Sequence, residues 1–102
     1  MKSRGLRLQY EFTAVVWKHS SDGSWYFVSL PEALSNEIRS QNGQLEEGWG
    51  RLRVTAVLID LRWDTAIWFD TRRRTYLLPI KSDVRKRKRI QAGDALALTV
   101  LI

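Results

Sequence analysis

The chain has 102 residues, 44% of them hydrophobic, with five Trp, no Cys and a formal net charge of +6. The length fits one domain, the apolar content excludes an intrinsically disordered chain, and the lack of Cys excludes disulfide bonds and thiolate metal sites. The longest stretch without a charged residue, residues 23–31, is too short to cross a bilayer as a helix. We therefore expect one domain over residues 1–102, located in the cytoplasm and with no membrane association.

The first thirty residues predict two strands. Apolar side chains occupy the even positions of residues 6–16, and this period of two indicates a strand with one buried face. Residues 20–24 contain three Ser, an Asp and a Gly, a composition that predicts a turn. Residues 25–30 then predict a second strand.

A short helix is expected next. Pro31 suits the first helical position, because the N–H that it lacks would have no partner there. Asn42 and Gly43 would end the helix, and residues 43–50, with three Gly and two Glu, predict an exposed loop. The apolar side of the helix would consist of Ala33, Leu34 and Ile38.

The second half of the chain predicts four strands. Residues 51–59 and 63–69 alternate between apolar and other side chains, and residues 75–78 form a short strand after a turn at Arg72-Arg73-Arg74. Residues 95–102 form the last strand. Alternation should place its even-numbered side chains in the core, namely Leu96, Leu98, Val100 and Ile102.

A second short helix is predicted before the last strand. Pro79 suits the end of a strand, because it has no N–H for a central ladder, and should open a helical turn. Ser82 is the expected N-cap, with Asp83 in the first turn, where the helix dipole favours an acid. Val84 and Ile90 should pack inward.

Six strands and two short helices, with strands adjacent in sequence, indicate a mainly β fold and a small barrel rather than a parallel sheet. Residues 26–31, which lead into the first helix, are echoed by residues 76–79 before the second. The barrel would then consist of two pseudo-two-fold halves, each a strand–helix–strand unit that buries its apolar face against the other.

A set of motifs runs through the second half: Gly48-Trp49-Gly50, Arg53-Val54-Thr55, Trp63-Asp64-Thr65-Ala66, Tyr76-Leu77-Leu78-Pro79-Ile80-Lys81, Val84-Arg85 and Gly93-Asp94. Together they resemble the family called domain of unknown function 1905. The chain departs from that pattern at Ile59-Asp60, where a Gly pair is common, and at Ala66, where Ser is usual. The resemblance implies a double-split β-barrel, related in fold to AbrB-like swapped-hairpin regulators, and it implies no function.

The excess positive charge is concentrated in one stretch. Residues 72–89 hold nine Lys or Arg and one acid, a net charge of +8, while the remainder of the chain carries −2. Such a segment can steer an anionic partner. Five consecutive residues surround a whole helix, however, so residues 85–89 also fit a solvated helix end. The candidate basic surface consists of Arg72, Arg73, Arg74, Arg85, Lys86, Arg87, Lys88 and Arg89.

A candidate small-anion pocket consists of Trp63, Thr65, Lys81 and Arg85. Trp63 and Thr65 share one face of a predicted strand, and the resemblance pairs them with the two cations. The alternative is a packed Trp with surface cations nearby. The five Trp offer stacking platforms for single-stranded nucleic acid, but in a small barrel most Trp are expected in the core. Trp49 is the one expected to be exposed.

The sequence contains no catalytic constellation. His19 is the only His, and neither a metalloprotease nor a nucleophile-elbow motif is present. We expect a non-enzymatic binding or interaction module with an electropositive segment at residues 72–89 and no cofactor. The alternatives are an AbrB-like DNA-binding protein and a small-anion or small-molecule binding domain. Nucleic acid or another polyanion is the candidate partner, and a monomer and a homodimer both remain open.

Overall fold

The computed structural model describes residues 7–19 and 25–102. It is mainly β, with one antiparallel sheet of seven strands in the order β1-β7-β4-β5-β6-β3-β2. No helix among the described residues is long and apolar enough to cross a membrane. In chain order the elements are β1 (Gln9–Val15), β2 (Trp17–Lys18), β3 (Tyr26–Ser29), α1 (Glu32–Asn42), the 3-10 turns η1 (Gly43–Leu45) and η2 (Gly48–Gly50), β4 (Arg51–Leu58), β5 (Leu61–Asp70), β6 (Thr75–Pro79), α2 (Ser82–Lys88) and β7 (Ala95–Leu101).

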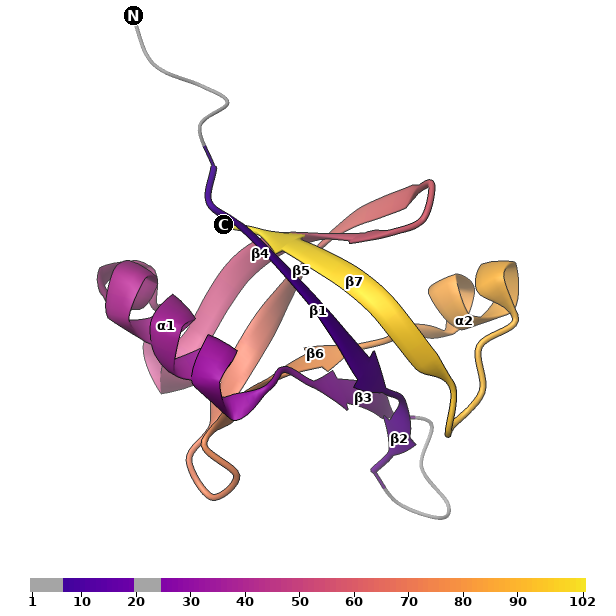
Figure 1. Cartoon of the computed structure of the whole chain (residues 1–102), viewed down its shortest axis with the longest axis horizontal. Helices are drawn as coiled ribbons and strands as arrows, with labels where there is room; N and C mark the ends of the chain where they lie inside the picture. Colours follow the sequence, from indigo (N-terminus) through magenta and orange to yellow (C-terminus); the bar gives the residue numbers. More distant parts are fainter. Residues whose placement is uncertain (1–6, 20–24) are drawn as a thin grey trace, which may run out of the picture.

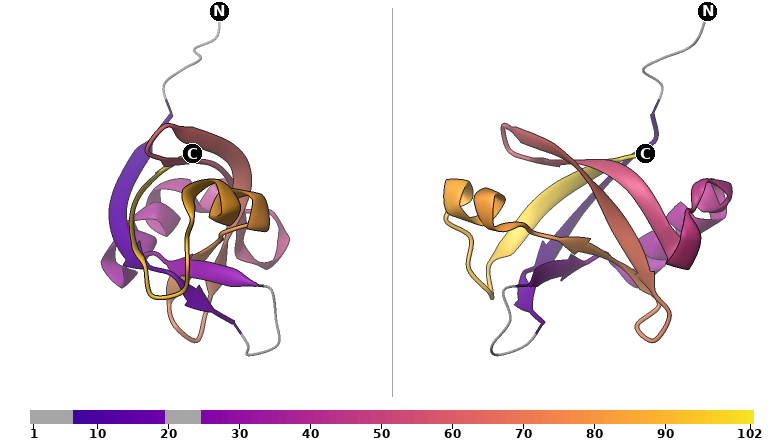
Figure 2. Two further views of the ribbon diagram at one scale, coloured as in Figure 1. Left: turned by 90° about the vertical axis from the view of Figure 1, so that its right-hand side faces the viewer. Right: turned by 180° about the vertical axis from the view of Figure 1, so that it is seen from behind.

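The sheet curls around the core as a half-barrel, and the two α-helices lie at opposite ends of it (Figures 1 and 2). The first predicted strand is two strands in the structure, which makes seven in place of the expected six. β1 pairs with β7, and β2 pairs with β3 at the other margin of the sheet. Only Val16 separates β1 from β2, and its N–H donates to the Asp94 carbonyl at 2.8 Å. The chain therefore changes partner at Val16, so one bent segment supplies both margins.

The pairing pattern repeats between two halves of the chain. β3 leads through α1 to β4, and β6 leads through α2 to β7. β3 pairs with β6, and β4 pairs with β7. β5 pairs with both β4 and β6, as the bent segment pairs with β7 and β3. The echo between residues 26–31 and 76–79 thus falls on two strands that hold equivalent places in the sheet.

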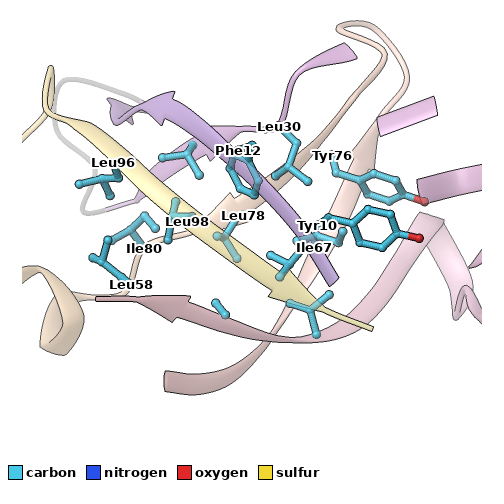
Figure 3. Packing of buried hydrophobic residues seen from close by; sticks show 14 of the residues in the cluster. Tyr10, Phe12, Leu30, Leu58, Ile67, Tyr76, Leu78, Ile80, Leu96 and Leu98 are labelled. Atoms are coloured by element: carbon cyan, nitrogen blue, oxygen red, sulfur yellow. The ribbon is translucent and has the colours of Figure 1, made fainter. Parts of the chain in front are cut away.

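The even-numbered residues of β4 and β7 form much of the core, as the alternation predicts (Figure 3). Val84 and Ile90 are buried with them, and Ile102 is half-buried. Leu8 was expected in the core but is exposed, because it lies before β1 at the margin of the sheet. Leu6 and the predicted turn at residues 20–24 lie outside the described residues.

Both helices begin at slightly different residues than the sequence predicts. Pro31 is the N-cap of α1 rather than its first residue, and the helix ends at Asn42 as predicted. Pro79 belongs to β6, opposite Phe27, and Ile80 and Lys81 separate it from α2. The N-cap of α2 is Lys81 and not Ser82, because the Lys81 carbonyl already accepts the Arg85 N–H at 3.0 Å.

Two buried polar side chains join α1 to the sheet. Ser35 Oγ accepts the backbone N–H of Tyr76 at 3.0 Å, which satisfies a donor inside the core. Asn42 donates to the Tyr10 hydroxyl at 2.9 Å. A buried polar group without such a partner would cost about 1–3 kcal/mol, so these bonds fix where the helix sits.

Ile59 stands in a strained turn. With Asp60 it links β4 to β5, and its φ is 58°, in the left-handed region that a β-branched side chain disfavours by about 1–2 kcal/mol. We expect Ile59→Gly to raise the free energy of unfolding by about 1 kcal/mol, measured by urea denaturation. Asp60→Gly is the control, because Asp60 has no positive φ and pairs with Lys88. If Ile59→Gly were less stable than the unaltered chain, the inference of backbone strain at Ile59 would be wrong.

Candidate functional site

The turn at Arg72-Arg73-Arg74 is tied down by an acid at the end of β5. The Arg72 N–H and the Arg73 guanidinium donate to Asp70 at 2.9 and 2.7 Å. Burial of Asp70 alone would raise the pKa of its carboxyl, but the hydrogen bonds from Arg73 and Arg72 outweigh it and hold that pKa below its ordinary value. Arg74 lies 3.7 Å from Glu32 of α1. Part of the charge of this turn is therefore neutralised locally.

The basic run at residues 85–89 spreads around α2. Arg85 donates to the Ile80 carbonyl at 2.6 Å and places its guanidinium 3.9 Å from the ring centre of Tyr26. Lys88 is half-buried and pairs with Asp60, and its hydrogen bond lowers the pKa of that carboxyl. Solvent surrounds the other three cations of the run, which are Lys86, Arg87 and Arg89.

The two basic segments do not form one continuous surface, although one cation of each, Arg73 and Arg85, contacts an aromatic ring of β2 or β3. The contact between Lys88 and Asp60 places the end of α2 at the turn before β5, whereas Arg72-Arg73-Arg74 follows the end of β5. Ten residues of strand separate these points, about 30 Å at the usual rise of a β-strand. Figures 1 and 2 show α2 and the β5–β6 turn on opposite sides of the molecule. Proximity in sequence was misleading here, because β6 carries the chain from that turn to α2.

A cleft opens where β5 and β6 part. These strands pair only between residues 68–70 and 75–77, so the earlier part of β5 has no partner on that side. The cleft there has a volume of about 420 Å³, and a second recess of about 270 Å³ shares Trp25, Pro79 and Lys81 with it. Side chains that line the cleft include Trp25, Arg53, Asp64, Thr65, Trp68 and Lys81.

Three of the four residues of the candidate pocket come together around these two recesses. Thr65 and Lys81 line the cleft, and Lys81 and Arg85 line the second recess. Trp63 lines neither, because its ring packs against the core cluster, where its buried indole N–H has no partner among the described residues. Sharing a strand face with Thr65 was thus not enough to place Trp63 in the pocket.

A row of aromatic rings, which we call the aromatic row, crosses the outer face of β2 and β3. Its members are Trp17, Phe27 and Trp25. The ring centres of Trp17 and Phe27 lie 5.2 Å apart, and Phe27 and Trp25 are nearly parallel at 6.2 Å. The Arg73 guanidinium stands 4.8 Å from the ring centre of Trp17 at one end, and His19 meets the edge of Phe27. Trp25, at the other end, is shared with the cleft.

The exposure of the Trp residues differs from expectation. None of the five belongs to the buried core, although most were expected there. The exposed fractions of Trp25 and Trp68 are 61% and 40%, and both side chains line the cleft. Trp49 is 92% exposed, as predicted, and has a positive φ between two Gly. The aromatic surface was therefore missed because aromatic residues are more often buried.

Positive charge borders the aromatic row at both ends. Arg73 stands at the Trp17 end, and Lys81 and Arg85 lie around the Trp25 end. Neither Lys81 nor Arg85 forms an ion pair with an acid of the described residues. Within the same residues no group of three or more His, Cys, Asp or Glu could hold a metal ion. The site offers flat apolar rings and, at the Trp25 end, two cations without an acidic partner among the described residues.

The sequence matches a known family model. A family model described as "Domain of unknown function (DUF1905)" matches residues 12–100. A search of curated proteins finds no match. The matched residues include the aromatic row, both recesses and both basic segments.

Proposed function

The chain belongs to the DUF1905 family, which is described only as a domain of unknown function. We propose that it is a non-enzymatic module that binds single-stranded nucleic acid along the aromatic row. The bases would stack on the exposed ring of Trp25 and on the half-buried rings of Phe27 and Trp17. The phosphates would meet Arg73 at one end and Lys81 with Arg85 at the other.

The observation that carries the proposal is the aromatic row between cations, exposed at Trp25 and half-buried at Phe27 and Trp17. Every base has a π face, so rings at stacking distance bind single strands with little regard to sequence, while cations follow the backbone. Trp25 is exposed to 61% beside a parallel Phe, and no second ring of residues 7–19 and 25–102 stacks on it. Bases inside a duplex are already stacked on each other, so this surface favours single strands.

Duplex DNA is the alternative, as in AbrB-like proteins. The exposed cations Lys86, Arg87 and Arg89 would favour it, because phosphate contacts alone bind duplexes without specificity. These residues lie around α2, however, and line neither recess.

The proposal includes the fold. We interpret the curled sheet as a six-stranded double-split β-barrel, with β1 and β2 counted as one bent strand. The equivalent pairings of the two halves support this interpretation, as does the early parting of β5 and β6.

Trp25→Ala tests the proposed function. We expect it to weaken binding of a labelled dT oligonucleotide of about 10 nucleotides by about tenfold or more, because one stacked base contributes about 1–3 kcal/mol. Fluorescence anisotropy at about 50 mM salt measures the affinity, since phosphate contacts are strong there.

Trp49→Ala is the matched control. Trp49 is even more exposed but lines neither recess and stacks with no described ring. Its loss should leave the affinity unchanged. Equal effects of the two substitutions, or no binding by the unaltered chain, would contradict the proposal. Tighter binding of a duplex of the same length would favour the alternative.

A further inference from the structure

The cleft contains a carboxylate that a phosphate site would not need. Asp64 lines it together with Arg53 and Lys81, and forms no ion pair with the cations of residues 7–19 and 25–102. Its Oδ1 accepts a hydrogen bond from the Thr55 hydroxyl at 2.9 Å. The oxygen of that hydroxyl accepts a hydrogen bond from the Arg7 guanidinium at 3.0 Å. The carboxylate is thus held in place on the outer face of β5.

A fixed carboxylate in a polyanion-binding cleft repels phosphate and selects for N–H donors. A carboxylate has about four lone-pair sites, and Thr55 uses one of them. Asp64 lines the cleft, whose other walls include Trp25, Trp68 and Pro79, and it also borders a recess lined by Arg7 and Thr55. Such a combination suits a flat ring with N–H groups on its edge, and a nucleobase has both.

We propose that the cleft reads one base of the bound strand through Asp64 and prefers guanine. This inference rests on the proposed function. Guanine presents two adjacent donors, N1–H and the N2 amine, to a carboxylate, and single-stranded bases are commonly read on this edge. Adenine and cytosine offer one exocyclic amine each. Thymine and uracil place two carbonyls beside their single N–H, and these repel the carboxylate.

The test compares two oligonucleotides of equal length, all-thymine and the same sequence with one central guanine. We expect the unaltered chain to prefer the guanine-containing strand by about tenfold, in line with a bidentate base contact. Asp64→Asn should remove this preference and bind the all-thymine strand more tightly, because a negative charge is lost. Thr55 can still donate to the amide oxygen of Asn, so the melting temperature should change little.

Asp83→Asn is the charge-matched control. Asp83 is exposed on α2 and lines neither recess, so its substitution should keep the guanine preference. If the unaltered chain binds both strands equally well, or if Asp64→Asn keeps the preference, base reading by Asp64 is wrong while the proposed function stands. If the unaltered chain binds neither strand, both proposals fail.

Discussion

Leu98→Asp is expected to leave the chain unfolded. Leu98 is 2% exposed in β7, opposite Phe12 of β1, and its side chain lies among the core residues in Figure 3. The substitution removes a buried Leu, worth about 2–5 kcal/mol, and buries a carboxyl with no partner, at a cost of several kcal/mol more. A small domain has only about 5–15 kcal/mol of stability. Circular dichroism and urea denaturation measure the result.

Ala97→Asp is the control for this prediction. Ala97 is the preceding residue of β7, and its side chain is exposed on the other face of the sheet. The same acid at this position should leave a folded chain with a cooperative transition. Cooperative unfolding of Leu98→Asp at the midpoint of the unaltered chain would mean that β7 is peripheral and that Leu98 does not belong to the core.

The alternation of apolar and polar residues was sufficient to predict most of the core. In β4 and β7 the even-numbered residues are apolar, and the structure buries them. The pattern failed where the sheet bends. Nothing in the alternation of residues 6–17 marks Val16 as the point at which the chain changes partner, because that change depends on Asp94, distant in the sequence.

The candidate site was harder to predict, for a physical reason. Residues 25–28 are all apolar or aromatic, so a period of two does not tell which pair faces the core. The structure buries Val28 and turns Trp25 outward. Only the pairing of β3 with β6 decides this, through Val28 opposite Leu78. The family resemblance predicted that Lys81 and Arg85 lie together. The cleft beside them forms where β5 and β6 separate.

Lys81→Glu with Arg85→Glu is expected to weaken binding of the dT oligonucleotide by about 100-fold or more. Both cations line the second recess next to Trp25 and form no ion pair within the described residues, so they are free to meet phosphate. Two charge-assisted hydrogen bonds contribute about 3–6 kcal/mol together. The plot of log affinity against log salt should also lose about 1.4 from its slope, because each single-strand phosphate contact adds about 0.7.

The double substitution Lys86→Glu with Arg87→Glu distinguishes the loss of a local phosphate site from the effect of a change in net charge. This pair lies on the same helix, is exposed and makes the same change in charge, but lines neither recess. Long-range repulsion alone should weaken binding only severalfold, because salt screens charges beyond about 10 Å at 0.1 M. Equal losses for the two double variants would mean that the strand binds to the basic helix as a whole, and the aromatic row would then have no part in phosphate placement.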